Sequence, residues 1–185
     1  MSSTIARILK VNHGGEYGAI RIYAAQIAVA RIRCPSLVSE LQGLLSHERR
    51  HEQTFLTLMP ARGARPCRLM WLWGIGGAIL GGLTALLGAY GVYVCTAAVE
   101  RTVHEHLSEQ LAWLSAQTSG PDGELMTAIA SIQLEEVGHL AWAEHGLGDA
   151  GWARPIDGLV SGIVEFLIWL STQGESARLS RDLKS

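Results

Sequence analysis

The stretch SHERRH, residues 46–51, decides the fold, because its spacing recurs in LEEVGH at residues 134–139. The first stretch pairs Glu48 with His51, and the second pairs Glu136 with His139. On an α-helix, side chains three residues apart lie on neighbouring parts of one face, so both can reach one site. On a strand they would point to opposite faces. Each Glu-x-x-His pair therefore predicts a helix that carries two metal ligands.

A further glutamate precedes each pair at a similar interval, Glu16 before Glu48 and Glu100 before Glu136. Each half of the chain therefore predicts a helical hairpin. Ferritin-like carboxylate proteins build a two-metal site from one Glu on each of two helices and Glu-x-x-His on each of the other two. The four glutamates and two histidines match that count. We predict an all-α, ferritin-like four-helix bundle.

Apolar residues recur at steps of three, four or seven around each glutamate, as expected for the buried face of a helix. We predict four helices: over about residues 4–33, over about residues 36–59, through Glu100 to about Thr118, and after a loop at residues 119–123. The Cys-Pro-Ser sequence at residues 34–36 separates the first two. Since the glutamates share these apolar faces, all four should point into the core.

The composition limits the class of protein. A length of 185 residues suits one domain, and a formal charge of −2 gives no reason to expect nucleic acid as a partner. Only 17% of residues are charged and 48% are hydrophobic, which is apolar for a soluble domain and suggests contact with a membrane or lipid. Cys34, Cys67 and Cys95 form no Cys-x-x-Cys motif, so we expect reduced thiols in a cytoplasmic setting. We also expect no signal peptide.

The segment from Leu69 to Val99 contains no charged residue. As one helix it would be about 46 Å long, whereas the hydrocarbon core of a bilayer is roughly 30 Å thick. Its several glycines favour a bend, and a full span would leave Glu16 across the bilayer from Glu100. We therefore expect an apolar, membrane-associating hairpin over residues 69–99 that lies in one leaflet and leads into the third bundle helix.

Within this hairpin we expect Leu80 and Leu83 to face lipid. Trp71 and Trp73 suit a membrane boundary, with core packing as the alternative. A further apolar segment, residues 156–170, predicts a C-terminal helix on the same surface. We place a single domain over residues 1–171 and a polar tail over residues 172–185.

Simpler roles compete for the candidate ligands. Alone, Glu16 or Glu100 could be a surface glutamate or the partner of a neighbouring arginine. Their place in the repeat favours a metal site, because four buried carboxylates need compensating cations or protons. Glu135 has Gly138 three residues on, so we expect it to be solvated and outside the site.

Histidines beyond the two pairs are weaker candidates. His104 and His106 follow Glu100 on its helix and could support the cluster or transfer protons, or could be partly exposed. His13, His47 and His145 complete no repeat. Carboxylate-rich sites with nitrogen ligands suit iron or manganese better than structural zinc, and we expect two iron ions.

Four motifs together resemble the demethoxyubiquinone hydroxylase family, the di-iron monooxygenases of ubiquinone biosynthesis. They are HGGEYGAIRIYAAQ (residues 13–26), SHERRH (46–51), LLGAYGVYVCTAAVERTVHEH (86–106) and LEEVGH (134–139). They occur in the family order, and the resemblance extends from about Arg7 to Leu170. In one departure, His106 is followed by Leu107 where the family has an aromatic residue, which puts an electron relay through a tyrosine there in doubt.

The resemblance implies that the protein lies peripherally on the cytoplasmic face of the inner membrane. There it would use dioxygen, two iron ions and a reductant that the sequence does not identify to hydroxylate a polyprenyl demethoxyubiquinol to the demethylubiquinol. It also suggests a ubiquinone-biosynthesis complex as partner. The implied iron ligands are Glu16, Glu48, His51, Glu100, Glu136 and His139. Geometry and resemblance together make Glu48 and Glu136 the bridging carboxylates, with Glu16 and His51 on one iron and Glu100 and His139 on the other.

Two other functions remain open. The first is another ferritin-like activity, such as a ferroxidase, a peroxidase or a hydroxylase of a different lipid. The uncharged hairpin disfavours a ferroxidase, which needs a hydrophilic path for iron. The second is a non-catalytic quinone-binding or assembly protein whose metal is only structural.

Overall fold

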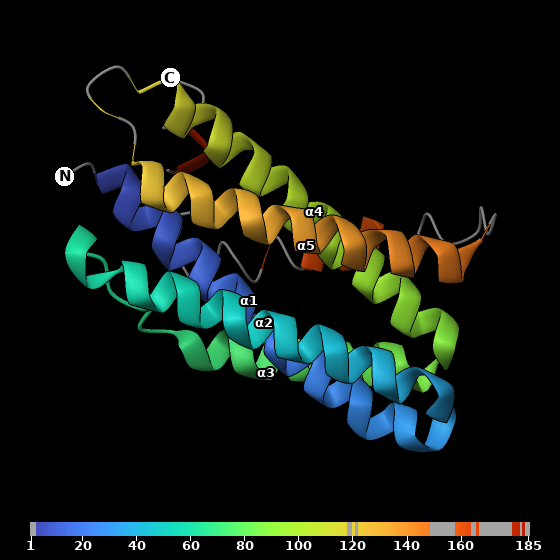
Figure 1. Cartoon of the computed structure of the whole chain (residues 1–185). Helices are drawn as coiled ribbons and strands as arrows, with labels where there is room; N and C mark the ends of the chain where they lie inside the picture. Colours follow the sequence, from blue (N-terminus) through green and yellow to red (C-terminus); the bar gives the residue numbers. More distant parts are fainter. Residues whose placement is uncertain are drawn as a thin grey trace.

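The computed structural model describes residues 3–117, 120, 122–148, 158–163, 166, 179–181 and 183. All regular elements within this part of the chain are helical, which confirms the all-α prediction there (Figure 1). The five long helices are α1 (Ser3–Arg33), α2 (Val38–Leu58), α3 (Met70–Leu86), α4 (Ala89–Ser115) and α5 (Gly123–Leu147). Short 3-10 helices at Pro35–Leu37 and Pro60–Arg62 flank α2.

Helices α1, α2, α4 and α5 form a bundle of two hairpins. Helix α1 packs against α2, α4 packs against α5, and the hairpins meet where α1 contacts α4 and α2 contacts α5 (Figure 1). These four helices are the ones predicted from the glutamate repeat. The second begins later than expected because Pro35 starts a 3-10 turn, and the third ends at Ser115 rather than near Thr118.

The core of the bundle is divided into two apolar clusters. Along α2, Leu41 and Leu44 belong to one cluster, and Phe55 and Leu58 belong to the other. These four side chains are at most 7% exposed. Burying each of them contributes about 1.5–3 kcal/mol to the free energy of folding. The α2 residues between them are largely polar. The two clusters thus enclose a polar layer in the middle of the bundle.

The start of α5 is tied to the end of α2. Asp122 caps α5 by accepting a hydrogen bond from the backbone N–H of Leu125 at 3.1 Å. Arg62, which is 7% exposed, donates to both carboxylate oxygens of Asp122 at 2.6 Å and to Glu124 at 2.9 Å. Because this arginine is buried and makes paired charged contacts, it fixes the α2 end of one hairpin to the other hairpin.

The uncharged segment bends, as its glycines predict. Helix α3 ends at Leu86, Gly88 adopts a left-handed φ of +79°, and α4 begins at Ala89. Gly81 on α3 lies so close to α1 that a Cβ there would collide with the backbone of Ile22. Helix α3 therefore packs along α1, outside the four-helix bundle. Among the described residues, none of the helices is long and apolar enough to span a membrane.

The outer side of α3 exposes a row of large apolar side chains. Trp71, Ile75, Ile79 and Leu83 are 54–61% exposed and follow one another at four-residue steps. Leu80 was expected to face lipid with Leu83, and this prediction is wrong: Leu80 is 7% exposed, because it lies on the side of α3 that faces the core. The two tryptophans lie on different sides of α3. Trp71 is exposed on the outer side, whereas Trp73 is only 5% exposed and packs in the core.

Two further predictions concern the C-terminal part of the chain. The helix expected over residues 156–170 and the tail over 172–185 lie largely outside the described residues, although residues 158–163 are helical.

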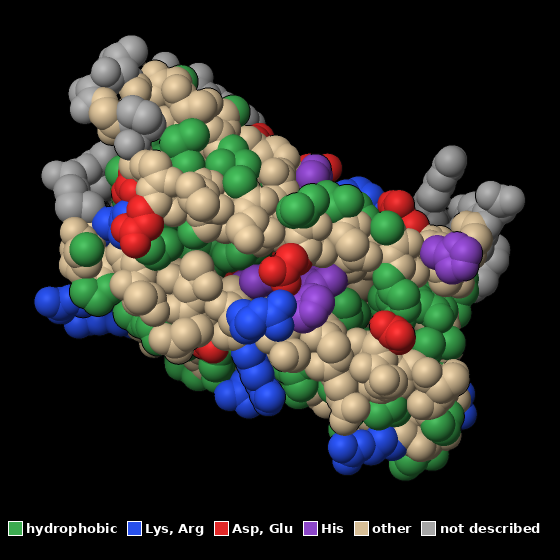
Figure 2. Space-filling model, in the orientation of Figure 1, with side chains coloured by type: hydrophobic (Ala, Val, Ile, Leu, Met, Phe, Trp, Pro, Cys, Tyr) green, Lys and Arg blue, Asp and Glu red, His purple; other side chains and the backbone are tan. Residues whose placement is uncertain are grey.

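On the face of the molecule drawn in Figure 2, histidine, acidic and basic side chains gather at one place over α2 and α5, with fewer charged groups around them.

Candidate metal centre

The polar layer between the two apolar clusters contains all six predicted ligands, contributed by four helices. Helix α1 supplies one of them, α2 supplies two, α4 one and α5 two. Each of the six residues is at most 4% exposed, so the prediction that the four glutamates point into the core is confirmed. The residues are Glu16, Glu48, His51, Glu100, Glu136 and His139.

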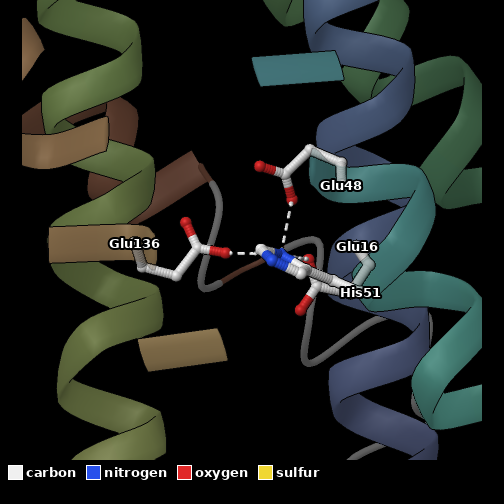
Figure 3. Close-up of side chains that lie close together, drawn as sticks. All are labelled: Glu16, Glu48, His51 and Glu136. Carbon is white, nitrogen blue, oxygen red and sulfur yellow. Dashed lines mark ion pairs between the residues drawn. The ribbon is translucent and has the colours of Figure 1, made fainter. Parts of the chain in front are cut away.

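One group of donor atoms surrounds His51. Its Nδ1 atom lies 2.9 Å from Oε1 of Glu136, 3.8 Å from Oε2 of Glu48 and 3.8 Å from Oε2 of Glu16. Figure 3 shows these four side chains converging, with Glu136 reaching across from α5 toward the α1 and α2 side. One donor atom from each lies within 4.8 Å of the others. A single ion could therefore contact all four.

A second group surrounds His139. Its Nδ1 atom lies 2.9 Å from Oε2 of Glu136, 3.3 Å from Oε1 of Glu48 and 3.7 Å from Oε1 of Glu100. Glu48 and Glu136 thus belong to both groups, and each presents one oxygen to His51 and the other to His139. This is the arrangement that a carboxylate needs to bridge two ions.

The donor atoms of this layer fit a pair of cations. Five of them are buried and each lies 2.9–3.3 Å from another, but they make no hydrogen bond of good geometry within the described part of the chain: Nδ1 of His51, Nδ1 of His139, Oε1 of Glu48, and both oxygens of Glu136. Buried polar atoms in native proteins nearly always have a partner. All five belong to the two groups, so two bound ions would satisfy all of them at once. Oxygen and imidazole donors suit iron or manganese.

Without cations, protons must balance the crowded carboxylates. Burial, with the charges of Glu48 and Glu136, raises the pKa of Glu16 well above its ordinary value. Burial and the charge of Glu136 raise the pKa of Glu100 to about 8. Burial also opposes the charge of His51, but contacts with Glu136 and Glu48 outweigh it and raise its pKa to about 10. Ion binding would therefore release protons from this site.

Sequence reasoning missed Tyr23 as part of the site. Its hydroxyl is buried and donates a hydrogen bond to Oε1 of Glu100. Tyr23 lies seven residues after Glu16, so the apolar periodicity around that glutamate indicated that Tyr23 is buried, but its partner depends on how α1 and α4 align. A second contact fixes the same alignment of the two helices. The side-chain amides of Asn12 on α1 and Gln110 on α4 exchange two hydrogen bonds, of 2.8 and 2.9 Å.

Glu135 and His47 lie closer to the centre than expected. Neither belongs to the two donor groups, but Oε2 of Glu135 lies 3.4 Å from Nε2 of His51 and 2.9 Å from Nη2 of Arg50. Glu135 thus lies outside both donor groups, as expected, but it is only partly solvated, because it also contacts His51 and Arg50. Burial alone would raise the pKa of Glu135, but the charges of His51 and Arg50 lower it below its ordinary value. Nδ1 of His47 lies 2.9 Å from Nε2 of His139.

Of the remaining candidate histidines, His106 borders the site. His106 lines a small cavity of about 30 Å³ together with Glu16 and with Trp73 from α3. Its neighbour His104 is half-buried, and neither histidine belongs to a donor group. Their role in supporting the centre stays a prediction.

The sequence is similar to proteins of known activity. The family described as ubiquinone biosynthesis protein COQ7 matches residues 3–171. The mouse (Mus musculus) mitochondrial NADPH-dependent 3-demethoxyubiquinone 3-hydroxylase is 39% identical over 137 residues, which cover 74% of this chain and 62% of the mouse protein. The 3-demethoxyubiquinol 3-hydroxylase of Rhodospirillum rubrum is 34% identical over 178 residues, which cover 92% of this chain and 78% of that protein. The matched region is thus less than two thirds of the mouse protein.

Proposed function

Because the chain belongs to the ubiquinone biosynthesis protein COQ7 family, we propose that it hydroxylates the ring of a demethoxyubiquinol, with dioxygen as co-substrate and two iron ions as cofactor. The product would be the demethylubiquinol. One observation carries the proposal beyond family membership: Glu48 and Glu136 each present one oxygen to either histidine-centred group.

In this proposal Glu16 and His51 would hold one iron, and Glu100 and His139 would hold the other. Glu48 and Glu136 would each contribute a carboxylate to both. When bound, reduced iron supplies electrons and the coordination positions at which dioxygen is activated.

The protein's own residues orient and enclose this chemistry. The apolar clusters on either side of the polar layer exclude water, which strengthens every charge interaction inside it. Tyr23 holds Glu100 by a hydrogen bond, so that carboxylate is fixed in its rotation. Because Glu48 and Glu136 come from the two different hairpins, packing of the hairpins sets the spacing of the two ion positions.

The substrate would be taken from a membrane, since a polyprenyl tail is insoluble in water. The exposed row of Trp71, Ile75, Ile79 and Leu83 supports peripheral attachment through α3. Arg65 and Arg68 precede this row and are exposed, as suits contact with anionic headgroups. We place this contact on the cytoplasmic face of the inner membrane, where a ubiquinone-biosynthesis complex would supply the substrate.

A cavity of about 30 Å³ beside Glu16, with room for one or two water molecules, marks the place where α3 approaches the predicted metal centre. It is lined by Trp73, on the inner side of α3, and by His106 on α4. Helix α3 therefore separates lipid on its outer side from the predicted metal centre on its inner side. We propose that the ring enters past α3 while the tail stays in the membrane.

The test is product formation under labelled dioxygen. Protein loaded with Fe(II) is mixed with a short-tail demethoxyubiquinol and isotope-labelled dioxygen, and the product is analysed by mass spectrometry. The proposal requires label in one new ring hydroxyl. Repeated oxidation of Fe(II) with no reaction of the quinol would instead support a ferroxidase.

A further inference from the structure

The two nitrogens of each site histidine lie in different surroundings. Nδ1 of His51 faces the carboxylates of the metal centre, whereas its Nε2 lies 3.4 Å from Oε2 of Glu135. Nδ1 of His139 also faces the carboxylates, and its Nε2 lies 2.9 Å from Nδ1 of His47. Each ring thus has a different nearest neighbour on the side away from the centre, and these two neighbours also contact each other, with Nδ1 of His47 lying 3.6 Å from Oε2 of Glu135.

A neutral imidazole that binds an ion through one nitrogen carries its proton on the other. An acceptor at that second nitrogen fixes both the position of the proton and the rotation of the ring. An ionised Glu135 can only accept hydrogen bonds, and His47 accepts through Nδ1 when its own proton is on Nε2. Both neighbours can therefore serve as the required acceptor.

We propose that Glu135 and His47 are positioning residues, each serving one ion of the pair. Glu135 orients His51 and so supports the ion on the Glu16 side, and His47 orients His139 and so supports the ion on the Glu100 side. This inference rests on the proposed two-metal function. It replaces the solvated role expected for Glu135 and gives a role to a histidine outside the repeat.

The surroundings of Glu135 hold it in place for this task. Nη2 of Arg50 lies 2.9 Å from the same oxygen that faces His51, and that contact favours the ionised carboxylate. The His47 ring stacks on the His139 ring with centroids 5.1 Å apart, so it is held by contact as well as by a hydrogen bond. The side chains of Glu135 and His47 are each 37% exposed, within the polar group over α2 and α5 in Figure 2.

An ion pair between helices is the competing explanation, and the chain offers a matched control for it. Glu144 on α5 pairs with Arg101 on α4 at 3.0 Å, much as Glu135 on α5 pairs with Arg50 on α2. Among the described residues, Glu144 pairs with Arg101 and with no histidine. If Glu135 acts only as a packing or ion-pair residue, replacing either glutamate should have the same effect on metal binding.

The first experiment measures Co(II) affinity of the full chain by competition with a chelator. Glu135→Leu and His47→Phe should each weaken binding of one of the two ions by roughly tenfold to hundredfold. The amide variants Glu135→Gln and His47→Gln keep an oxygen acceptor and should recover most of the loss. The controls Glu144→Leu and His145→Phe should stay within twofold of the wild type.

The second experiment assigns each effect to one histidine. Long-range nitrogen–proton NMR spectra of the zinc-loaded protein should place the proton of both site histidines on Nε2. The signal of His51 should change more than that of His139 in Glu135→Leu, and the reverse should hold in His47→Phe; some effect on the second ring is expected, because Nδ1 of His47 lies 3.6 Å from Oε2 of Glu135.

The inference is overturned if the wild type binds two ions and Glu135→Leu behaves as Glu144→Leu does, or if the protons lie on Nδ1. If the wild type binds no ion, the proposed function fails first, and this inference fails with it.

Discussion

Replacing Glu100 with Gln should stabilise the metal-free protein at alkaline pH and have little effect at acidic pH. Burial, with the charge of Glu136, raises the pKa of Glu100 from 4.5 to about 8. The folded chain therefore keeps a proton that the unfolded chain releases, so the free energy of unfolding falls as the pH rises from 4.5 to 8. At about 1.4 kcal/mol per pKa unit, this carboxyl lowers stability by less than about 1 kcal/mol at pH 5 and by about 4 kcal/mol at pH 8.

Glutamine has nearly the same shape, carries no charge, and can still accept the hydrogen bond from Tyr23. Urea unfolding of chelator-treated protein at pH 5 and pH 8 measures the effect, with Glu144→Gln as a control that removes an exposed carboxylate. The variant should gain stability over the wild type only at pH 8. Adding Zn(II) should reverse the order, because the wild type keeps a ligand that the variant has lost.

An equal difference at both pH values, or a Glu100→Gln protein that is less stable at pH 8, would refute the account of crowded, protonated carboxylates. The same result would weaken the case for cations as their natural partners.

Three further outcomes follow from the geometry. Glu136→Ala should abolish ring hydroxylation, measured by mass spectrometry of the product, because it removes an oxygen from each donor group, whereas Glu144→Ala should stay within twofold of the wild type. Leu83→Glu should reduce sedimentation with anionic liposomes while the protein stays folded; Leu80→Glu should instead unfold it, since a charge there would be buried. Asp122→Ala should lower the free energy of unfolding in urea by about 2–4 kcal/mol, because a helix cap and a charged partner of a buried arginine are both lost; a loss below about 0.5 kcal/mol would contradict that role.

The spacing of the site residues predicted much of the centre before the structure. Glu48 and His51 must share a helix face whatever the bundle around them looks like, and the repeat at Glu136 and His139 then requires a partner helix. Local periodicity is enough for this conclusion, because each pair lies within one turn of one helix. The bend near Gly88 was predictable for a similar local reason.

Contacts between helices were not predictable in this way. Glu135 meets His51 only because α2 and α5 face each other at a particular rotation, and neither helix alone determines that rotation. Leu80 was misplaced because α3 is apolar on both sides, so its sequence cannot show which side packs against α1. The partner of Tyr23 likewise depends on how α1 and α4 align.

The most direct test of the two-metal account is the number and coupling of bound iron ions. Purified protein is loaded anaerobically with Fe(II), oxidised, and examined by iron analysis together with Mössbauer spectroscopy in an applied field. Two irons per chain with magnetically coupled spins are predicted, and Glu136→Ala should lose the coupled signal. A single iron per chain, or two irons without magnetic coupling, would contradict a centre bridged by Glu48 and Glu136.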